Sequence, residues 1–450
     1  MKITVVGTGH VGLVAGLCFA EIGHEVGCHD TDGRKIEALR AGRTPFFEPH
    51  LDDLLARLGP SGRIRFDSDL ESHVNDAEVI FLCIGTPPLA DGDADLSGVE
   101  KATRLIATHS TAYKLIVEKS TVPVLTGDRI HRTMQIYGSA APFDVASNPE
   151  FLSEGTAVDD FLHPQRTVIG VESARAEALL RQIYEPVRTQ SFACPIHPAC
   201  EWSGRETPLV VTTRRSAEII KHASNSFLAT KISFINAIAS LCERVGADVG
   251  EVAAGMGLDR RIGPGFLRAG AGFGGFCFPK DLQAFIRIAE KSGYDFRLLR
   301  EVERVNREQM EAFFRKIKNE VWVLAGKRIA AWGLAFKPDT DDVRFAPALA
   351  VIEKLLAEGA TVAAYDPRAI DEARAVLPPS SSMVYCASAE EAAAGADALV
   401  VFTEWREFLD RDWERIRASM ARPLIVDGRN LYRPAEMRRL GFEYFSVGRP

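Results

Sequence analysis

The sequence predicts an α/β protein with two doubly wound parallel-sheet domains, joined by a long central helix and a helical region suited to forming a dimer. Three observations predict this class. Short apolar runs alternate with helical segments near both ends of the chain, a glycine-rich turn follows the first run, and a long amphipathic segment separates the two groups. Since 450 residues are too many for one hydrophobic core, we expect domains at 1–209, 210–318 and 319–450.

Composition and charge narrow the classes of function. The chain is 46% hydrophobic and 26% charged with a formal net charge of -7, so nothing favours binding to nucleic acid or to an anionic membrane. Its eight cysteines show no paired C-x-x-C spacing, so we expect neither a zinc site nor a disulfide framework, and no metal. The first residues enter a strand directly, and no apolar run is long enough to cross a bilayer. These observations predict a cytoplasmic protein with reduced thiols.

The first predicted strand, Lys2–Val6, leads into a turn with the pattern G-x-G-x-x-G and then into a helix over Leu13–Ile22. A second strand around Glu25–Cys28 ends near Asp30, about 20 residues beyond the glycines, where an acid can bind the ribose 2′-hydroxyl of a dinucleotide. We therefore expect a Rossmann-like domain that binds NAD rather than NADP; a tight turn without a ligand is the alternative. The turn residues expected at the cofactor are Gly7, Gly9, Val11 and Gly12.

Two further strands of the first sheet, Val79–Cys83 and Leu115–Val117, are expected to end in turns of small or polar residues. These turns are Gly85–Pro88 and Ser120–Pro123. Because ligands of doubly wound sheets bind beyond the carboxyl ends of the strands, we expect both turns to line the nicotinamide half of the site. Each could equally be a turn and nothing more.

A candidate pair of acid/base groups follows in the segment Asn148–Glu154. Asn148 suits a helix N-cap and Pro149 the first helical position, which would place Glu150 and Glu154 on one face of a helix. Paired carboxylates can move protons during catalysis. Acids favoured by the dipole of a first helical turn are the alternative.

The central helix is predicted over Ser216–Ile238 from its amphipathic spacing. Lys221 and Asn225 lie one turn apart on it, and both are donors that could meet an oxyanion. A solvated lysine and a polar interface residue are the alternative. Because the helix separates the first sheet from the rest of the chain, we expect it to act as a hinge and as a dimer element.

Cys277 lies in the glycine-rich run Gly270–Asp281, shortly before Pro279. Glycines allow a ligand close to the backbone, proline suits a first helical turn, and a helix N-terminus favours the thiolate form of cysteine. Asp281 follows four residues later on the same helical face. We expect a reactive thiol; a buried structural cysteine in a glycine-rich turn is the alternative.

A second doubly wound sheet is predicted from the apolar runs Arg328–Gly333, Thr361–Ala364, Ala398–Phe402 and Pro423–Val426. It lacks the phosphate-binding glycine pattern, so it need not bind a dinucleotide. The loops after its first and last strands carry cations suited to a diphosphate, namely Lys337, Arg344 and Arg429.

These motifs resemble, from end to end, those of the UDP-glucose/GDP-mannose dehydrogenase family. The matching segments are G-T-G-H-V-G at Gly7, G-T-P-P at Gly85, K-S-T-V-P at Lys119, N-P-E-F-L-S-E-G at Asn148, E-I-I-K-H-A-S-N at Glu218, R-I-G at Arg261, G-F-G-G-F-C-F-P-K-D at Gly272, G-L-A-F-K-P at Gly333 and D-G-R-N at Asp427. The resemblance implies a four-electron oxidation of a nucleotide sugar at C6, with two NAD reduced and an enzyme-bound thioester. It favours UDP-glucose as the substrate over GDP-mannose or a UDP-N-acetylhexosamine, and a homodimer or higher homo-oligomer.

The resemblance also assigns roles to individual residues. Cys277 would be the nucleophile, with Asp281 and Lys221 handling protons and oxyanions. Asn225 would help to hold the attacking water or the oxyanion, and the ordered-water partners would be Glu150 and Thr121. The implied contacts of NAD are Asp30, Lys35, Thr86, Thr121, Glu154 and Arg344. Those of the nucleotide sugar are Glu150, Phe151, Leu152, Glu154, Lys221, Asn225, Phe273, Gly274, Phe336, Lys337, Arg429 and, reaching across a dimer interface, Arg261.

Three features depart from the family pattern. Phe276 stands where serine is common, Phe345 stands where an acid is frequent, and the connection from Cys194 to Pro208 is long. We interpret that connection, with Cys200 and Trp202, as a surface loop rather than a site. A non-catalytic sensor of NAD or nucleotide sugars is the alternative from another class, although a sensor needs no thiol. A two-electron dehydrogenase of the 6-phosphogluconate type would need neither the cysteine nor a second nucleotide domain.

Overall fold

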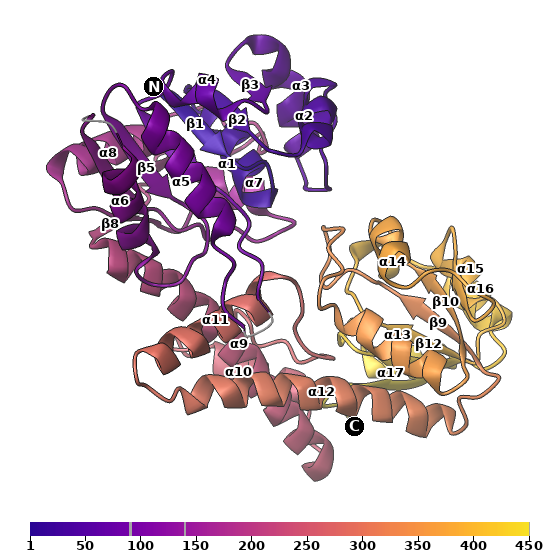
Figure 1. The fold of residues 1–450 in the computed structure, drawn as a ribbon. Coiled ribbons are helices and arrows are strands. Elements are labelled where there is room, and N and C mark those ends of the chain that lie inside the picture. The colour runs from indigo at the N-terminus through magenta and orange to yellow at the C-terminus, as the bar shows by residue number, and fades with distance from the viewer. Residues whose placement is uncertain (90–91, 139–140, 450) are drawn as a thin grey trace. The chain divides into compact units, whose positions relative to one another are not determined.

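The structure, a computed structural model, describes residues 1–89, 92–138 and 141–449 (Figure 1). The chain forms two compact units, Met1–Ser224 with Gln283–Ile288, and Asn225–Leu282 with Ala289–Pro450. Each unit contains one sheet flanked by helices, so the predicted α/β class with two doubly wound sheets is confirmed. The three domain boundaries expected from the sequence stay a prediction.

The first unit is built on an eight-stranded sheet with the order β3-β2-β1-β4-β5-β6-β7-β8. Its strands are β1 Lys2–Val6, β2 Glu25–His29, β3 Ile64–Asp67, β4 Val79–Leu82, β5 Lys114–Glu118, β6 Phe143–Ser147, β7 Thr167–Gly170 and β8 Leu209–Thr212. Neighbours from β3 to β6 pair in parallel, whereas β6 and β7 pair antiparallel through Ser147 and Gly170. The expected parallel sheet thus gains an antiparallel extension, since the connection after β6 holds only one short helix instead of a long crossover helix.

Helices cover both faces of this sheet (Figure 1). They are α1 His10–Glu21, α2 Gly33–Arg40, α3 Leu51–Leu58, α4 Leu70–Val74, α5 Ser97–His109, α6 Thr126–Tyr137, α7 Ala157–Leu162 and α8 Ala174–Thr189, with the 3-10 turn η1 Gly59–Ser61. Successive side chains of a strand point to opposite faces. Ile3 and Val5 of β1 therefore join a core with α1, α3 and α8, while Val6 joins a separate core with α5 and α6. Burial on both faces explains the continuous apolar runs of these strands.

Long helices occupy the middle of the chain. They are α9 Arg214–Val245, α10 Val249–Gly257, α11 Cys277–Lys291 and α12 Arg297–Val321. The helix predicted over Ser216–Ile238 is confirmed as part of α9, which contributes residues to both units. Within the described ranges, no helix is both long enough and apolar enough to cross a membrane.

The second unit contains a six-stranded, wholly parallel sheet with the order β11-β10-β9-β12-β13-β14. Its strands are β9 Arg328–Trp332, β10 Thr361–Tyr365, β11 Met383–Tyr385, β12 Ala398–Val401, β13 Leu424–Asp427 and β14 Glu443–Ser446. Its remaining helices are α13 Pro347–Ala357, α14 Ile370–Val376, α15 Ala389–Ala393, α16 Trp413–Ser419 and α17 Pro434–Arg439, with the 3-10 turn η2 Arg406–Phe408. This order is the one found in dinucleotide-binding sheets. The four strands predicted for this sheet are confirmed as β9, β10, β12 and β13.

The two sheets repeat one arrangement at the end of their first strand. Gly7 after β1 and Gly333 after β9 both have positive φ values, of 102° and 89°, and both donate to the last residue of the neighbouring strand. An acid beyond that neighbouring strand, the half-buried Asp30 or the buried Asp366, then accepts backbone hydrogen bonds from the turn. The repeat ends there, because α1 begins soon after its turn whereas α13 begins only at Pro347. The second sheet therefore has no helix N-terminus directly behind its turn, which fits its missing glycine pattern.

Candidate functional site

The glycine turn of the first unit leaves room for a ligand at the start of α1. A Cβ on Gly7 would lie 2.4 Å from the carbonyl oxygen of Cys83, and one on Gly12 would lie 1.9 Å from that of Gly7. Both positions therefore require glycine, whereas a Cβ on Gly9 would meet nothing within 4 Å. Gly9 is the N-cap of α1 and has no side chain to accept a capping hydrogen bond from the first amide groups of the helix. Val11 lies in the first turn. Amide groups at such a helix start suit a pyrophosphate.

Asp30 is held in place by the turn that it faces. Its Oδ2 accepts hydrogen bonds from the backbone and the hydroxyl of Thr8, both at 2.8 Å, and its Oδ1 accepts one from the backbone of Asp32 at 2.9 Å. Lys35, on α2, lies 4.0 Å away. Partial burial opposes ionisation of Asp30, but these hydrogen bonds outweigh it and lower the pKa of the carboxyl group. The group is thus an ionised acceptor fixed beside the glycine turn.

The two turns expected beside a nicotinamide are joined to one another. Thr86, which follows β4, is buried, and its hydroxyl donates to the carbonyl oxygen of Thr121 at 2.8 Å. Because β4 and β5 are parallel neighbours, their carboxyl ends bring these turns to the same edge of the sheet. Glu154 lies in the loop after β6, the next strand along that edge.

The segment that follows β6 corrects one prediction. The helix expected from Asn148 does not form, and the chain remains a loop until α7 begins at Ala157. Asn148 is buried and uses its amide in the core, accepting from Lys119 and donating to Val168, so it does not cap a helix. Glu150 accepts instead from the backbone of Leu152 at 2.7 Å. Glu150 and Glu154 therefore do not share a helical face.

Glu150 forms a buried ion pair with Lys221 of α9 in the first unit. Their closest atoms, Oε1 and Nζ, are 2.8 Å apart, and each side chain is only 5% exposed. The ring of Phe151 lies beside this pair, 5.6 Å from the Lys221 ammonium group, with the Arg166 guanidinium stacked over it at 3.8 Å. A buried pair of this kind seldom exists for stability, because removing both charges from water costs as much as their attraction gains. Such a pair is a candidate for proton transfer or oxyanion binding.

A second buried polar cluster lies at the start of α11. The Nδ2 of Asn225 donates to Oδ2 of Asp281 at 2.6 Å, and the Lys280 ammonium group lies 2.9 Å from Oδ1 of the same carboxylate. Asp281 is 1% exposed. Cys277 is the first residue of this helix and is half-buried, as the predicted helix N-terminus requires. Asn225 and Asp281, which the sequence places 56 residues apart, thus meet one turn from the thiol.

The backbone of Gly270–Phe276, which precedes the thiol, is fixed by side-chain amides. The Asn236 carbonyl accepts from Gly270, Gln309 donates to the carbonyl oxygen of Gly270, and Asn306 both accepts from and donates to Phe273, at 2.7–3.0 Å. These three amides were not predicted from the sequence. Amide residues on the core faces of α9 and α12 were the available signal, because a buried amide must find partners.

The same loop packs tightly on the loops of the second sheet. A Cβ on Gly274 would lie 2.3 Å from the carbonyl oxygen of Phe345, and one on Gly275 would lie 2.7 Å from the ring of Phe336. Arg429 donates three hydrogen bonds, to the carbonyl oxygens of Gly272, Phe336 and Phe402. The expected sugar-side residues Phe273, Gly274, Phe336 and Arg429 are therefore brought together, with Lys337 stacked beside the Phe336 ring at 5.5 Å.

The two remaining predicted arginines differ in their contacts: the carbonyl oxygen of Arg344 accepts a hydrogen bond from Gly275 in the loop before the thiol, whereas Arg261 makes local contacts. Arg344 forms a two-point ion pair with Asp342 and stacks on the ring of Phe276, 4.3 Å from its centre. Phe276, which departs from the family pattern, therefore supports the arginine. Arg261 is 89% exposed and pairs only locally, with Asp259.

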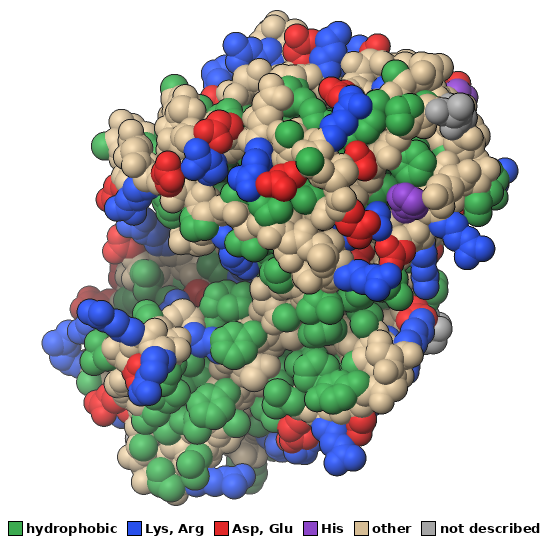
Figure 2. Space-filling model, turned by 90° about the vertical axis from the view of Figure 1, so that its left-hand side faces the viewer, with side chains coloured by type: hydrophobic (Ala, Val, Ile, Leu, Met, Phe, Trp, Pro, Cys, Tyr) green, Lys and Arg blue, Asp and Glu red, His purple; other side chains and the backbone are tan. Residues whose placement is uncertain are grey.

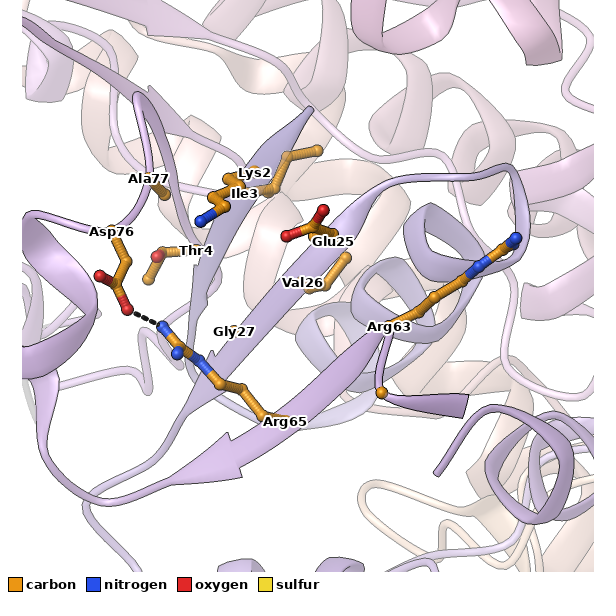
Figure 3. A pocket seen from close by; sticks show the side chains of 11 residues that line it. Lys2, Ile3, Thr4, Glu25, Val26, Gly27, Arg63, Arg65, Asp76 and Ala77 are labelled. Carbon is orange, nitrogen blue, oxygen red and sulfur yellow. Dashed lines mark hydrogen bonds and ion pairs between the residues drawn. The ribbon is translucent and has the colours of Figure 1, made fainter. Parts of the chain in front are cut away.

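A pocket at the other edge of the first sheet is separate from these residues. Figure 3 shows it at the amino ends of β1 and β2, with Lys2 and Glu25 among its lining residues and the Arg65–Asp76 ion pair beside it. Ligands of doubly wound sheets bind at the carboxyl edge, where the glycine turn lies. We therefore do not assign this pocket to the cofactor.

The buried ion pair of Glu150 and Lys221 leads to a prediction about stability. Glu150→Gln keeps the shape of the side chain but removes the carboxylate beside Lys221, and we expect the free energy of unfolding to fall by about 3–5 kcal/mol. The double variant Glu150→Gln/Lys221→Met should regain most of this loss, because neither charge remains buried. Urea denaturation followed by circular dichroism measures both changes.

The matched control for this pair is Glu177→Gln, which removes the carboxylate from a surface pair with Arg181. We expect this variant to lose less than about 1 kcal/mol. Equal losses in the Glu150 and Glu177 variants would contradict the assignment of a buried charge pair.

Comparison with known proteins matches the chain over three segments. Residues 1–188 match the NAD binding domain of the UDP-glucose/GDP-mannose dehydrogenase family, residues 215–308 match its central domain, and residues 330–434 match its UDP binding domain. A UDP-glucose 6-dehydrogenase of Rhizobium meliloti is 46% identical over 454 residues, with all of both chains covered. One of Bacillus subtilis is 44% identical over 450 residues, covering 100% of this chain and 93% of the relative.

Comparison with solved structures indicates the same family. A UDP-glucose dehydrogenase from the archaeon Pyrobaculum islandicum superposes with a TM-score of 0.88 at 36% identity, covering 99% of this chain and 96% of the other. A UDP-D-ManNAc dehydrogenase from Pyrococcus horikoshii superposes with a TM-score of 0.84 at 28% identity, covering 100% and 99%. The chain therefore belongs to the UDP-glucose/GDP-mannose dehydrogenase family, with NAD as its cofactor.

Proposed function

We propose that the protein oxidises UDP-glucose at C6 to UDP-glucuronate, reducing two NAD in each turnover through a thioester on Cys277. The observation that carries this proposal is a half-buried thiol at the first residue of α11, one turn from the buried Asp281 carboxylate that Asn225 and Lys280 hold. Full-length identity of 46% to a UDP-glucose 6-dehydrogenase favours UDP-glucose over other nucleotide sugars.

The chemistry requires two oxidations of one carbon. NAD, when bound, accepts a hydride at each of the two steps. The C6 alcohol first loses a proton and a hydride to become an aldehyde, and the Cys277 thiolate adds to that aldehyde to give a thiohemiacetal. Loss of a second hydride and proton gives the thioester. Water then attacks the thioester carbon, the carbon–sulfur bond breaks, and the carboxylate leaves while the thiol is restored.

Each step develops charge on oxygen that the chain must stabilise. We assign this role to the Lys221 ammonium group and the Asn225 amide, which are donors carried one turn apart on α9. Glu150, at 2.8 Å from Lys221, is placed to take or return its proton, or to orient a water with Thr121. Asp281 accepts from Asn225 and would receive the proton of the attacking water.

Binding residues follow from the same proposal. Asp30 would accept hydrogen bonds from the adenosine ribose, with Lys35 beside it, and the amides of Gly9–Gly12 would bind the pyrophosphate. Thr86, Glu154 and Arg344 complete the proposed NAD contacts. On the sugar side we assign Phe151, Leu152, Phe273, Gly274, Phe336, Lys337 and Arg429. Arg429 donates one hydrogen bond to the loop that carries the thiol, at Gly272, and the other two to Phe336 and Phe402.

The NADH formed per nucleotide sugar consumed tests the proposal. With purified protein and NAD, we expect two NADH for each UDP-glucose, and about a tenfold or greater preference in kcat/KM over GDP-mannose and UDP-N-acetylglucosamine, since a misfitting sugar leaves buried polar groups unpaired. Two NADH per sugar with GDP-mannose or UDP-N-acetylglucosamine, and none with UDP-glucose, would keep the mechanism but change the assigned substrate. A stoichiometry of one would contradict the thioester, and no turnover with any of the three would favour a sensor.

Cys277→Ser is the variant that isolates the thiol. A serine hydroxyl is far less acidic and less nucleophilic, so we expect steady formation of UDP-glucuronate to fall by at least about a thousandfold. Cys242→Ser, at a buried cysteine in the core of the second unit, is the matched control and should retain turnover. Unchanged acid formation by the Cys277 variant would overturn the mechanism.

We further propose that the protein acts as a homodimer through α9. This helix exposes Phe227, Phe234 and Leu241 at a spacing of seven residues, each about half or more exposed, followed by Val245 at 66%. That spacing is typical of helices that pack against a partner helix. Figure 2 shows hydrophobic side chains gathered in the lower part of the view, where the central helices lie. Arg261, with its 89% exposed side chain, would reach the partner's substrate.

Disrupting this face tests the dimer. Phe234→Glu and Leu241→Glu place charges at the proposed contact, and we expect the molar mass measured by light scattering to halve and activity to fall with it. Leu409→Glu, at a 51% exposed leucine elsewhere in the second unit, is the control and should leave the dimer intact. A wild-type monomer, or dimers in all three variants, would contradict this interface.

A reducing, cytoplasmic setting is proposed from the cysteines. Five of the eight cysteines are buried as thiols in the two cores, whereas disulfides are typical of exported proteins. A catalytic thiol needs the same setting to remain reduced.

A further inference from the structure

Four potential metal ligands meet in the long connection between α8 and β8. Cys194, His197 and Cys200 follow the spacing C-x-x-H-x-x-C, and His163, which follows α7, joins them from 31 residues earlier. One donor atom from each of the four lies within 4.8 Å of all the others. His163 is buried, both cysteines are half-buried, and the His197 side chain is 42% exposed, so the cluster extends from the interior to the surface.

The distances fit a tetrahedral ion. The Sγ of Cys194 is 3.7 Å from Nδ1 of His197, and the Sγ of Cys200 is 3.3 Å from Nε2 of His163. Zinc bonds of about 2.3 Å to sulfur and about 2.0–2.1 Å to nitrogen, at tetrahedral angles, place such donors about 3.6 Å apart. The observed pairs lie on either side of this value. The backbone amide of His197 also donates to the Cys194 sulfur at 3.3 Å and so fixes the position of that ligand atom.

His163 is oriented as a metal ligand. Its Nδ1 lies 2.7 Å from the Asp159 carboxylate, and its ring is only 1% exposed. That contact makes Nδ1 the donor and leaves Nε2 with its lone pair directed toward Cys200. A carboxylate behind a histidine is the usual outer support of a zinc ligand. The rings of Phe192 and Trp202 pack beside the His163 ring, with centroids 6.0 and 5.9 Å from it.

We propose that Cys194, Cys200, His163 and His197 bind one structural zinc ion. Two thiolates and two imidazoles in a tetrahedral arrangement select zinc over harder ions, and four protein ligands leave no open position for substrate. A disulfide between the two cysteines would not explain why two histidines lie beside them or why Asp159 orients the His163 ring. The site is distinct from the cysteine and carboxylates of the proposed reaction, and it does not depend on which sugar is oxidised.

The ion would add to the contacts that hold this segment. The chain from 191 to 208 contains neither helix nor strand; Phe192 and Ile196 pack on the core of the first unit, and the backbone of Thr207 donates to Arg188. Binding through His163 would join this segment to the end of α7. The start of α7 is held separately, because Glu48 accepts from the backbone of Gly155 and Ala157. The loop that contains Glu150 leads directly into this helix, so the zinc would help to hold that loop indirectly.

This proposal revises two expectations from the sequence. The expectation of no metal rested on the missing C-x-x-C spacing, and the segment was interpreted as a surface loop. The cysteines are instead separated by five residues with a histidine midway, and the fourth ligand is remote in sequence.

Metal analysis of tag-free protein, purified without chelator and with zinc in the growth medium, tests the site. By inductively coupled plasma mass spectrometry we expect one zinc per chain in the wild type, and about a tenfold lower content in Cys194→Ser and His163→Ala. Cys277→Ser is the matched control and should keep its zinc. Asp159→Asn should retain the ligands but weaken zinc affinity by about 10–100-fold in a chelator competition.

A second measurement does not depend on variants that fold. Wild-type protein stripped with a chelator under reducing conditions should lose thermal stability and regain it with zinc, because the ion binds only the folded chain. Refilling with Co²⁺ should give thiolate-to-cobalt charge-transfer absorption and the visible bands of tetrahedral cobalt. A wild-type chain without zinc that shows no such absorption, or a Cys194–Cys200 disulfide found by peptide mass spectrometry in the purified protein, would overturn the proposal.

Discussion

The hydrogen bonds that fix Gly270–Phe276 are the constraint on which the proposed chemistry depends. The loop is rich in glycine and would be mobile by itself, yet Asn236, Asn306 and Gln309 bind its backbone directly. Leaving one such buried group without its partner costs about 1–3 kcal/mol. The loop ends at Cys277, so its rigidity sets where the thiol stands. A nucleophile misplaced by about 1 Å loses much of its rate, which explains why so many amides serve one loop.

The two sheets share the same turn after their first strand, but the segments that follow this turn suit different ligands. In both units a glycine with positive φ follows the first strand, and an acid beyond the next strand fixes the turn. In the first unit α1 starts at once and directs its amides at the turn, which suits a pyrophosphate. In the second unit the chain from Gly333 to Ala346 intervenes, and it supplies Lys337, Arg344 and the contacts of Gly274 and Gly275.

The strands and the glycine turn could be predicted from the sequence, because two-sided burial gives continuous apolar runs and a close backbone approach demands glycine. The partners of buried polar residues could not. Asn148 suits a helix N-cap by its local sequence, but its amide bonds to Lys119 and Val168 instead. His163 shows the same limit, since its distance from Cys194 in the chain hides a contact that only folding creates.

The reactivity of Cys277 tests the proposed thioester mechanism directly. Limited alkylation with iodoacetamide, followed by peptide mass spectrometry and parallel activity assays, reports which cysteine reacts first and whether its loss stops turnover. We expect that Cys277 is modified first, that activity falls in step with that modification, and that UDP-glucose slows both. Full turnover to the acid by protein whose Cys277 is completely alkylated would contradict it.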